Sequence, residues 1–313
     1  MSSEASSWYA SLYEVIISLI FVILIFVFKR YRWLLPADDR DTNTQNAVDF
    51  AGCDSPDCVR CRKYKRIQGQ LLPKLEDIAT KGSWDGLERI LSAIEEVDIH
   101  SANQETTLQQ PNVFFLPGLR SVPWCEDVHR RELRKIKDSH QRILQDFKNI
   151  YRDFRSGNPD GWLTNNVPTG EWHVFHLINQ GVTIEQNCRR CPKTVQLLTE
   201  LDNLMTNNVF GNATFSVLQP GTHITEHYGP TNARLRAHIG LIVPPKCHLT
   251  VGGETRNWAE GECLIFDDSF LHEAKHDGRC KDGPRVIFMV DFWHPDVTDL
   301  ERKVLDDLFA STE

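Results

Sequence analysis

The chain has 313 residues, of which 41% are hydrophobic and 25% charged, with 18 glycines and 15 prolines. This composition excludes a collagen, a low-complexity chain and a wholly disordered protein. The 35 Lys and Arg residues against 43 Asp and Glu residues give a net charge of −8, so no nucleic acid partner is expected. The nine cysteines are an odd number, which excludes a fold built only on intrachain disulfides.

An apolar stretch near the N-terminus predicts a single membrane anchor. After a short tail at residues 1–7, residues 8–28 are long enough to span a bilayer core as one helix. Tryptophan and tyrosine residues flank the stretch on both sides, as in an interfacial aromatic belt. A cleaved signal peptide is the alternative, but the stretch lacks a basic n-region and a cleavage site of small residues.

Residues 29–111 have the composition of a connector. In this region Cys53, Cys58 and Cys61 have the spacing of the first three cysteines of a plant-type iron–sulfur site, and three thiolates also suit zinc. No fourth ligand is close in the sequence, so ordinary thiols or one disulfide are the alternative. Apolar residues at helical spacing over residues 87–97 predict one short amphipathic helix.

From residue 112 to the C-terminus, the chain has the pattern of one compact domain. Apolar periodicity predicts a long helix over residues 126–154 and a second helix over residues 192–207, with Pro192 in its first turn. A last helix is predicted to begin with a capping box at Thr298.

Beyond residue 211 the period of the hydrophobic pattern falls to two, which predicts strands. Helices followed by a run of strands favour an antiparallel sheet closed into a sandwich and backed by helices. The expected fold class is therefore mainly β with flanking helices. The predicted strands are residues 214–218, 235–243, 248–252, 263–266 and 286–293.

Two histidines and three further residues are the candidate site. His227 lies in the turn after one strand and His272 just past another, so the two imidazoles could meet at one metal ion. Imidazole binds Fe, Zn, Cu and Ni alike, so the pair does not identify the metal. Ordinary core or surface histidines are the alternative. Arg285 begins the final strand, where a buried guanidinium needs an anion such as a carboxylate. Arg236 and His238 alternate with apolar residues and therefore face one side of their strand.

Four sequence segments, in this order, resemble a known family. They are PGLRSVPWCE (117–126), HYGPTNARLRAHIGLIVP (227–244), WAEGECLIFDDSFLHEA (258–274) and VDFWHPDVT (290–298). Together they resemble the aspartyl/asparaginyl β-hydroxylase family over about residues 112–298. The details CRRCPKT and NNVFGNA, with the connector cysteines, are similar to its membrane-anchored aspartate β-hydroxylase domain-containing members.

The resemblance implies a double-stranded β-helix (a cupin-like jelly roll) over residues 112–313. It also implies a dioxygenase that depends on Fe(II) and 2-oxoglutarate and uses O2 to hydroxylate the β-carbon of Asp, Asn or a related residue in a protein or peptide substrate. His227 and His272 would be the iron ligands, and Arg285 would bind the distal carboxylate of 2-oxoglutarate. A membrane-anchored binding module that keeps the fold without turnover is the alternative. The other implied cosubstrate contacts are Trp172, Ser216, Arg236, Ala237 (through its backbone) and His238.

The usual third iron ligand is missing. Non-haem iron sites commonly use a carboxylate two residues after the first histidine, and that position is Gly229 here, a gap that the family shares. An aspartate introduced at Gly229 is expected to add a ligand and tighten iron binding while lowering turnover. Asp267 and Asp268 are expected to orient the imidazoles, whereas Glu226 should point away from the metal.

Two signals oppose each other on membrane orientation. Lys29, Arg30 and Arg32 directly follow the apolar stretch, which favours a cytosolic C-terminal domain by the positive-inside rule. The resemblance instead favours a signal anchor in the endoplasmic reticulum or another endomembrane, with a lumenal domain.

Cys188 and Cys191 flank two arginines at the start of the second predicted helix. A thiol in that position is expected to ionise more readily than a free cysteine, and a reduced thiol at either position is expected to label faster at neutral pH than Cys247 or Cys263. A structural or idle pair is the alternative.

Overall fold

The computed structural model describes residues 62–95 and 108–311, all of which belong to one compact unit. Within these two ranges, no helix is both long enough and apolar enough to cross a membrane. The predicted span at residues 8–28 and the three-cysteine motif that begins at Cys53 lie outside the described residues and stay predictions.

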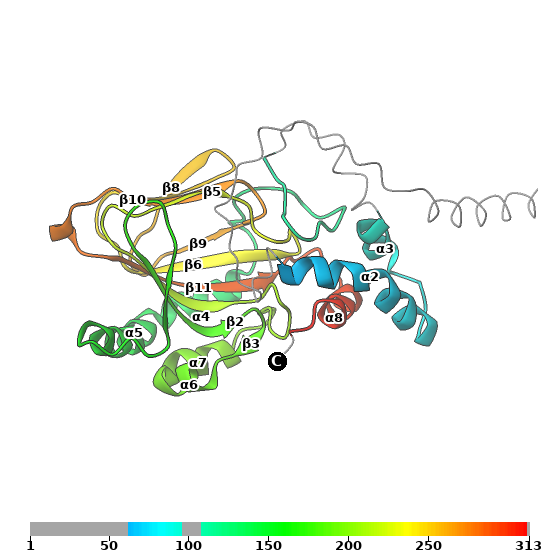
Figure 1. The fold of residues 1–313 in the computed structure, drawn as a ribbon, viewed down its shortest axis with the longest axis horizontal. Coiled ribbons are helices and arrows are strands. Elements are labelled where there is room, and N and C mark those ends of the chain that lie inside the picture. The colour runs from blue at the N-terminus through cyan, green and yellow to red at the C-terminus, as the bar shows by residue number, and fades with distance from the viewer. Residues whose placement is uncertain (1–61, 96–107, 312–313) are drawn as a thin grey trace, which may run out of the picture. The chain divides into compact units, whose positions relative to one another are not determined.

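Two antiparallel sheets form the centre of the protein (Figure 1). The strands are β1 (Trp162–Asn165), β2 (Trp172–Asn179), β3 (Val182–Thr183), β4 (Ala213–Leu218), β5 (His223–His227), β6 (Arg234–Ile242), β7 (Cys247–Val251), β8 (Glu254–Asn257), β9 (Cys263–Phe266), β10 (His272–His276) and β11 (Arg285–Trp293). The 7-stranded sheet has the order β1-β2-β4-β11-β6-β9, with β3 paired to β2, and the 4-stranded sheet has the order β5-β10-β7-β8. The prediction of a mainly β protein with flanking helices is confirmed.

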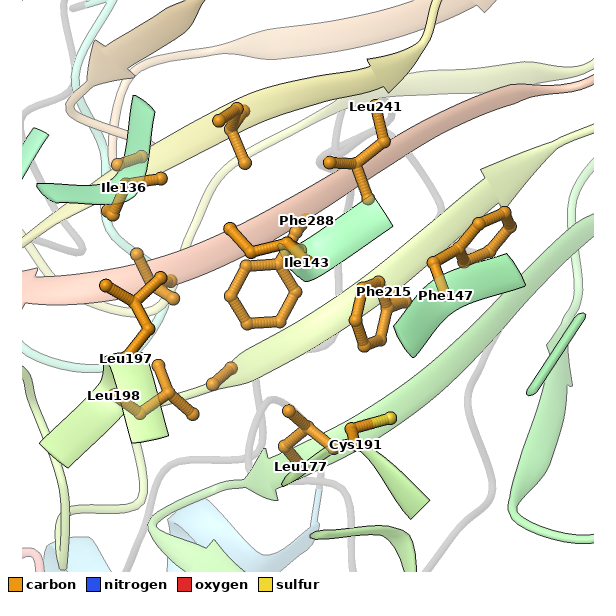
Figure 2. Close-up of a cluster of buried hydrophobic side chains, with 14 of the residues drawn as sticks. Ile136, Ile143, Phe147, Leu177, Cys191, Leu197, Leu198, Phe215, Leu241 and Phe288 are labelled. Carbon is orange, nitrogen blue, oxygen red and sulfur yellow. The ribbon is translucent and has the colours of Figure 1, made fainter. Parts of the chain in front are cut away.

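The main hydrophobic core lies between the larger sheet and four helices that cover one of its faces. In Figure 2, Phe147 of one helix and Leu197 of another lie near Phe215 of β4 and Phe288 of β11. Because successive strand residues face opposite sides, this packing uses only every second residue of each strand. The helices are α4 (Arg130–Asp138), α5 (His140–Arg155), α6 (Glu185–Arg190) and α7 (Pro192–Thr199).

The other face of the larger sheet is turned toward the smaller sheet, and we call it the inner face. The register pairs Met289 of β11 with His238 of β6, and Asp291 with Arg236. These residues and Arg285 lie on the inner face, because the residues that alternate with them are buried in the main core. The prediction that Arg236 and His238 share one side of their strand is therefore confirmed.

Two predicted helices differ from those in the structure. The predicted helix over residues 126–154 is two helices, because ψ at Ser139 is 1° and the backbone there leaves the helical region. The predicted helix over residues 192–207 ends at Thr199. Asn203 has a φ of 60°, and a helix of L-residues does not continue through such a left-handed residue.

Two N-terminal helices pack against the C-terminal helix. They are α2 (Arg62–Lys81) and α3 (Glu88–Glu95), and the C-terminal helix is α8 (Asp299–Leu308). Leu75 and Val304 belong to one hydrophobic cluster, and Arg89 donates from Nε to Glu301 over 2.8 Å. α3 and the capping box of Thr298 are as predicted, whereas α2 was not predicted. Part of the predicted connector thus belongs to the core.

Burial keeps the thiols of Cys188 and Cys191 protonated. Burial raises the pKa of both thiols, and the Cys191 side chain is fully buried. The Cys188 Sγ donates to the carbonyl oxygen of Leu177 over 3.4 Å. The prediction that these thiols ionise more readily than a free cysteine is wrong, because the loss of hydration raises the pKa of both and, for Cys191, outweighs the positive charge of Arg190.

We therefore expect Cys191 in the folded protein to react with iodoacetamide much more slowly than the exposed Cys280. Cys247 and Cys263, whose pKa values burial raises to about 11 and about 12, should also react slowly. Timed alkylation followed by peptide mass spectrometry measures all four rates. Modification of Cys191 ahead of Cys280 would contradict this prediction.

Candidate functional site

The two candidate histidines lie side by side on neighbouring strands. His227 is the last residue of β5 and His272 the first residue of β10, and the two are direct partners in the antiparallel register. Their ring centroids are 4.1 Å apart. The expectation that both histidines lie just beyond strands is thus wrong in detail. Both are strand residues, in two strands that the hydrophobic pattern did not predict because they are rich in polar residues.

Backbone carbonyls orient both imidazoles. The Nδ1 atom of His227 lies 2.8 Å from the carbonyl oxygen of Thr225, and Nδ1 of His272 lies 2.9 Å from that of Phe270. A carbonyl oxygen only accepts, so each Nδ1 carries a hydrogen, and in the neutral form of each ring Nε2 carries the lone pair that a metal ion needs. The orienting role expected of Asp267 is therefore filled by the backbone.

Asp267 and Asp268 organise the turn before His272 in other ways. Asp267 accepts hydrogen bonds from the backbone N–H and hydroxyl of Ser269, at 2.9 Å and 2.6 Å. Asp268 accepts from the Nε of Arg234 over 3.1 Å. Although burial opposes the charged form, the neighbouring arginines hold the pKa of Asp268 well below its usual range.

The position expected to take a third ligand is closed. A Cβ atom at Gly229 would lie 2.5 Å from Cγ and 2.7 Å from the carbonyl oxygen of Asp268. In the described ranges, no group of three or more His, Cys, Asp or Glu side chains is placed to hold a metal ion. Glu226, which is expected to point away from the metal, is exposed. The described residues thus provide a pair of imidazoles rather than a triad.

We expect Gly229→Asp to weaken metal binding, not to tighten it, because any Cβ at position 229 must displace Asp268 and the turn before His272. Gly229→Ala should weaken binding to a similar extent, since it introduces the same collision without a carboxylate. Calorimetric titration of both variants with Co(II) checks this expectation. Tighter binding by the aspartate variant alone would restore the third-ligand hypothesis.

Arg285 is a buried cation with unpartnered donors. It is 1% exposed, and its Nε and Nη1 atoms have no hydrogen-bond partner in the described structure. Its guanidinium lies over the ring of Trp258, with 4.6 Å between Cζ and the ring centroid. Burial lowers the pKa of Arg285 to about 9. An anion bound at these donors would relieve this unfavourable burial of charge.

His238 adds a third unpartnered donor to the same interior. Trp258 Nε1 donates to His238 Nδ1 over 3.3 Å, so the hydrogen of the neutral ring is on Nε2. That Nε2 atom is buried and has no partner in the described structure. Burial, aided by the positive charges of Arg236 and Arg285, lowers the pKa of His238 well below its ordinary value. His238 therefore offers a fixed neutral donor.

Arg236, by contrast, is already neutralised. Its Nε and Nη2 donate to the two carboxylate oxygens of Asp291 at 2.7 Å and 2.9 Å, and its Nη1 lies 3.3 Å from Asp268. Although burial opposes the charge, these carboxylates raise the pKa of Arg236. Two arginines and two aspartates balance in this group, which we call the arginine–aspartate cluster. Its members are Arg234, Arg236, Asp268 and Asp291.

Of the other predicted cosubstrate contacts, Trp172 and Ser216 contact each other, whereas the Ala237 side chain lies away from them in the main core. Trp172 Nε1 donates to the hydroxyl of Ser216 over 3.0 Å, so these two residues are partners of each other. The Ala237 side chain lies in the main core, on the opposite face of β6 from His238. Trp258 was missed by the sequence reasoning, although it begins one of the quoted segments. A tryptophan among charged residues was the available signal.

Fold and site together define the class of protein: a two-sheet antiparallel β protein with paired histidines and a buried cationic donor set between its sheets. The sequence model of the aspartyl/asparaginyl beta-hydroxylase family matches residues 127–295. The chain belongs to this family.

The relatives agree with that assignment. The chain is 49% identical to aspartate beta-hydroxylase domain-containing protein 2 of Xenopus tropicalis over 263 residues, covering 83% of this chain and 71% of the relative. It is 35% identical to the aspartyl/asparaginyl beta-hydroxylase of Mus musculus over 209 residues, covering 66% of this chain and 28% of that protein. Among solved structures, the non-heme alpha ketoglutarate dependent epimerase SnoN overlaps 52% of this chain and 83% of its own, at 13% identity. The TM-score of this overlap is 0.33.

Proposed function

We propose that the protein is an Fe(II)- and 2-oxoglutarate-dependent dioxygenase with a double-stranded β-helix fold, which hydroxylates the β-carbon of Asp, Asn or a related residue in protein substrates. One observation supports this proposal above the others. Two donors on Arg285 and one on His238 are buried without a partner in the described structure, and His238 and His272 both pack against Phe266. Buried polar groups in native proteins are nearly always satisfied, so this set calls for an anionic ligand.

The residues present fit both groups that the proposal requires. His227 and His272 would hold the iron through their Nε2 atoms, since both Nδ1 atoms are engaged by backbone carbonyls. Arg285 and His238 would hold a carboxylate of 2-oxoglutarate. When both groups are bound, they supply the oxidation, in which O2 and 2-oxoglutarate yield succinate, CO2 and a hydroxylated substrate.

The contribution of the chain is orientation and charge. Trp258 fixes the tautomer of His238 and covers one face of the Arg285 guanidinium. The arginine–aspartate cluster is internally balanced, so Arg285 is the stronger attractor for a dicarboxylate. Arg279, the nearest alternative in the preceding loop, is exposed and would bind an anion weakly.

The direct test is conversion of 2-oxoglutarate to succinate by the full chain with Fe(II), without added substrate. Succinate above the level of an Arg285→Ala control supports turnover. Binding of 2-oxoglutarate with no succinate supports the second candidate, a binding module without turnover. The closed position at Gly229 does not separate the two candidates, because the resemblance implies that the family as a whole lacks a carboxylate there.

We expect Trp258→Phe to raise the KM for 2-oxoglutarate about 3- to 10-fold with a smaller effect on kcat, as one hydrogen bond is worth roughly 0.5–1.5 kcal/mol. Phenylalanine keeps an aromatic face under Arg285 but no longer fixes the His238 hydrogen on Nε2. Trp124→Phe is the matched control, since Trp124 also lies under an arginine and its Nε1 has no partner in the described structure. An unchanged KM in Trp258→Phe would remove His238 from the anion site.

A further inference from the structure

A short segment at residues 108–116, which we call the strap, pairs with the loop before His272 and with the loop after His227. We call these two loops the ligand loops. Its first part pairs with the loop before His272. Gln110 N–H donates to the Ser269 carbonyl over 3.0 Å, and Leu271 N–H donates to the Leu108 carbonyl over 2.8 Å. The strap lies N-terminal to residue 127, where the family match begins.

The second part of the strap pairs with the loop after His227. Asn112 N–H donates to the Gly229 carbonyl over 3.0 Å, and Phe114 N–H donates to the Pro230 carbonyl over 3.0 Å. Leu116 N–H donates to the side chain of Asn232 over 2.8 Å, and that side chain donates back to the Leu116 carbonyl. One stretch of backbone thus binds both ligand loops.

Two strap side chains strengthen these connections. Gln109 donates from Nε2 to Asp267 over 2.9 Å and to the Ser269 hydroxyl over 3.0 Å, on the His272 side. Asn112 donates from Nδ2 to the Tyr228 carbonyl over 3.0 Å, next to His227. Each side chain therefore anchors the strap to a different ligand loop.

The strand pairing at the histidine pair is not regular by itself. The register of β10 against β5 shifts between His272 and Ala274, directly beside the paired histidines. A bulge of this kind disrupts the local ladder, so it holds the two backbones less firmly than regular pairing. The strap donates and accepts hydrogen bonds in the loop before His272 and the loop after His227, next to this bulge.

We propose that the strap fixes the separation of His227 and His272, with Gln109 and Asn112 as positioning residues that keep a two-ligand site assembled. This inference rests on the proposed metal site. A site with only two protein ligands loses more from a small misplacement of either one than a triad does, because no third side chain restrains the metal. Preorganisation by the strap takes the place of that restraint.

The experiment uses the full chain and Co(II) as a spectroscopic stand-in for iron. The variants are Gln109→Ala, Asn112→Ala, Asn112→Asp and the double alanine variant. Asn112→Asp keeps the side-chain shape but cannot donate to Tyr228, so it should behave like alanine. Gln145→Ala and Asn149→Ala are matched controls, because these residues bond each other on α5, on the opposite face of the larger sheet. His227→Ala reports the loss of the site itself.

We expect each strap variant to bind Co(II) about 3- to 10-fold more weakly and to change its visible spectrum, with a larger loss in the double variant. Hydrogen exchange of the metal-free protein should speed up in peptides that contain Gly229 and Leu271, whose N–H groups bond Asp268 and Leu108. The helix controls should leave affinity, spectrum and exchange in these peptides unchanged.

The outcomes separate the two proposals. Strap variants that match the controls in affinity and in exchange would overturn the positioning role. Wild-type protein that binds Co(II) no better than His227→Ala would contradict the proposed metal site. In that case the exchange measurement, which needs no metal, still decides whether the strap holds the two loops.

Discussion

Replacing Arg285 with alanine should abolish the use of 2-oxoglutarate while leaving metal binding nearly unchanged. The guanidinium is the unbalanced buried cation of the inner face, whereas Arg236 is neutralised by Asp291 and Asp268. Loss of a desolvated charged contact costs about 2–5 kcal/mol of binding, or at least about 30-fold in Kd. His227 and His272 lie on other strands, so the affinity for metal should not fall when Arg285 is replaced.

Removing the charge at position 285 has a second expected effect, on stability. Without an anion, a buried guanidinium with two unpartnered donors opposes folding. We therefore expect Arg285→Met, which fills much of the volume without a charge, to unfold at a temperature no lower than wild type when 2-oxoglutarate is absent. If Arg285 instead stabilised the fold, Arg285→Met would unfold at a lower temperature than wild type.

Isothermal titration of Arg285→Ala with 2-oxoglutarate and thermal unfolding of Arg285→Met, each beside wild type, measure these two effects. Arg256→Ala is the control, because Arg256 also lies over a tryptophan but is paired with Glu126 and Glu254. Normal 2-oxoglutarate affinity in Arg285→Ala would move the anion site to another cation.

The parts of the fold that could be predicted are those with a local signal. The alternation over β6 places Arg236 and His238 on one face because side-chain direction follows from strand geometry alone. The capping box at Thr298 is equally local. The strands β5 and β10 escaped prediction because their residues are mostly polar.

The site itself depends on contacts between residues distant in sequence. No local pattern pairs Arg236 with Asp291, yet this pairing decides that Arg285 is the unbalanced cation. The collision of a side chain at Gly229 with Asp268 likewise appears only when two loops meet. Cys191 shows the reverse case, since its neighbouring arginines are visible in the sequence but its burial is not.

Replacing either His227 or His272 with alanine should eliminate metal binding at micromolar Co(II) or Fe(II). Within the described residues no third carboxylate, cysteine or histidine is placed to complete a cluster, so each variant keeps one imidazole. A single imidazole competes poorly with water for these ions. Fe(II) and Co(II) bind protein ligands more weakly than Ni(II) or Cu(II), so the loss of one ligand should be easy to detect.

His223 and His248 are the matched controls for this pair. Both lie in strands of the same small sheet, and both face carboxylates, with His223 Nε2 2.9 Å from Glu273 and His248 Nε2 3.7 Å from Asp277. Their alanine variants should keep wild-type metal affinity in calorimetry. Micromolar affinity retained after loss of His227 or His272 would mean that another group holds the metal. The effect of Arg285→Ala would then remain a test of the anion site alone, because the two halves of the site are carried by different sheets.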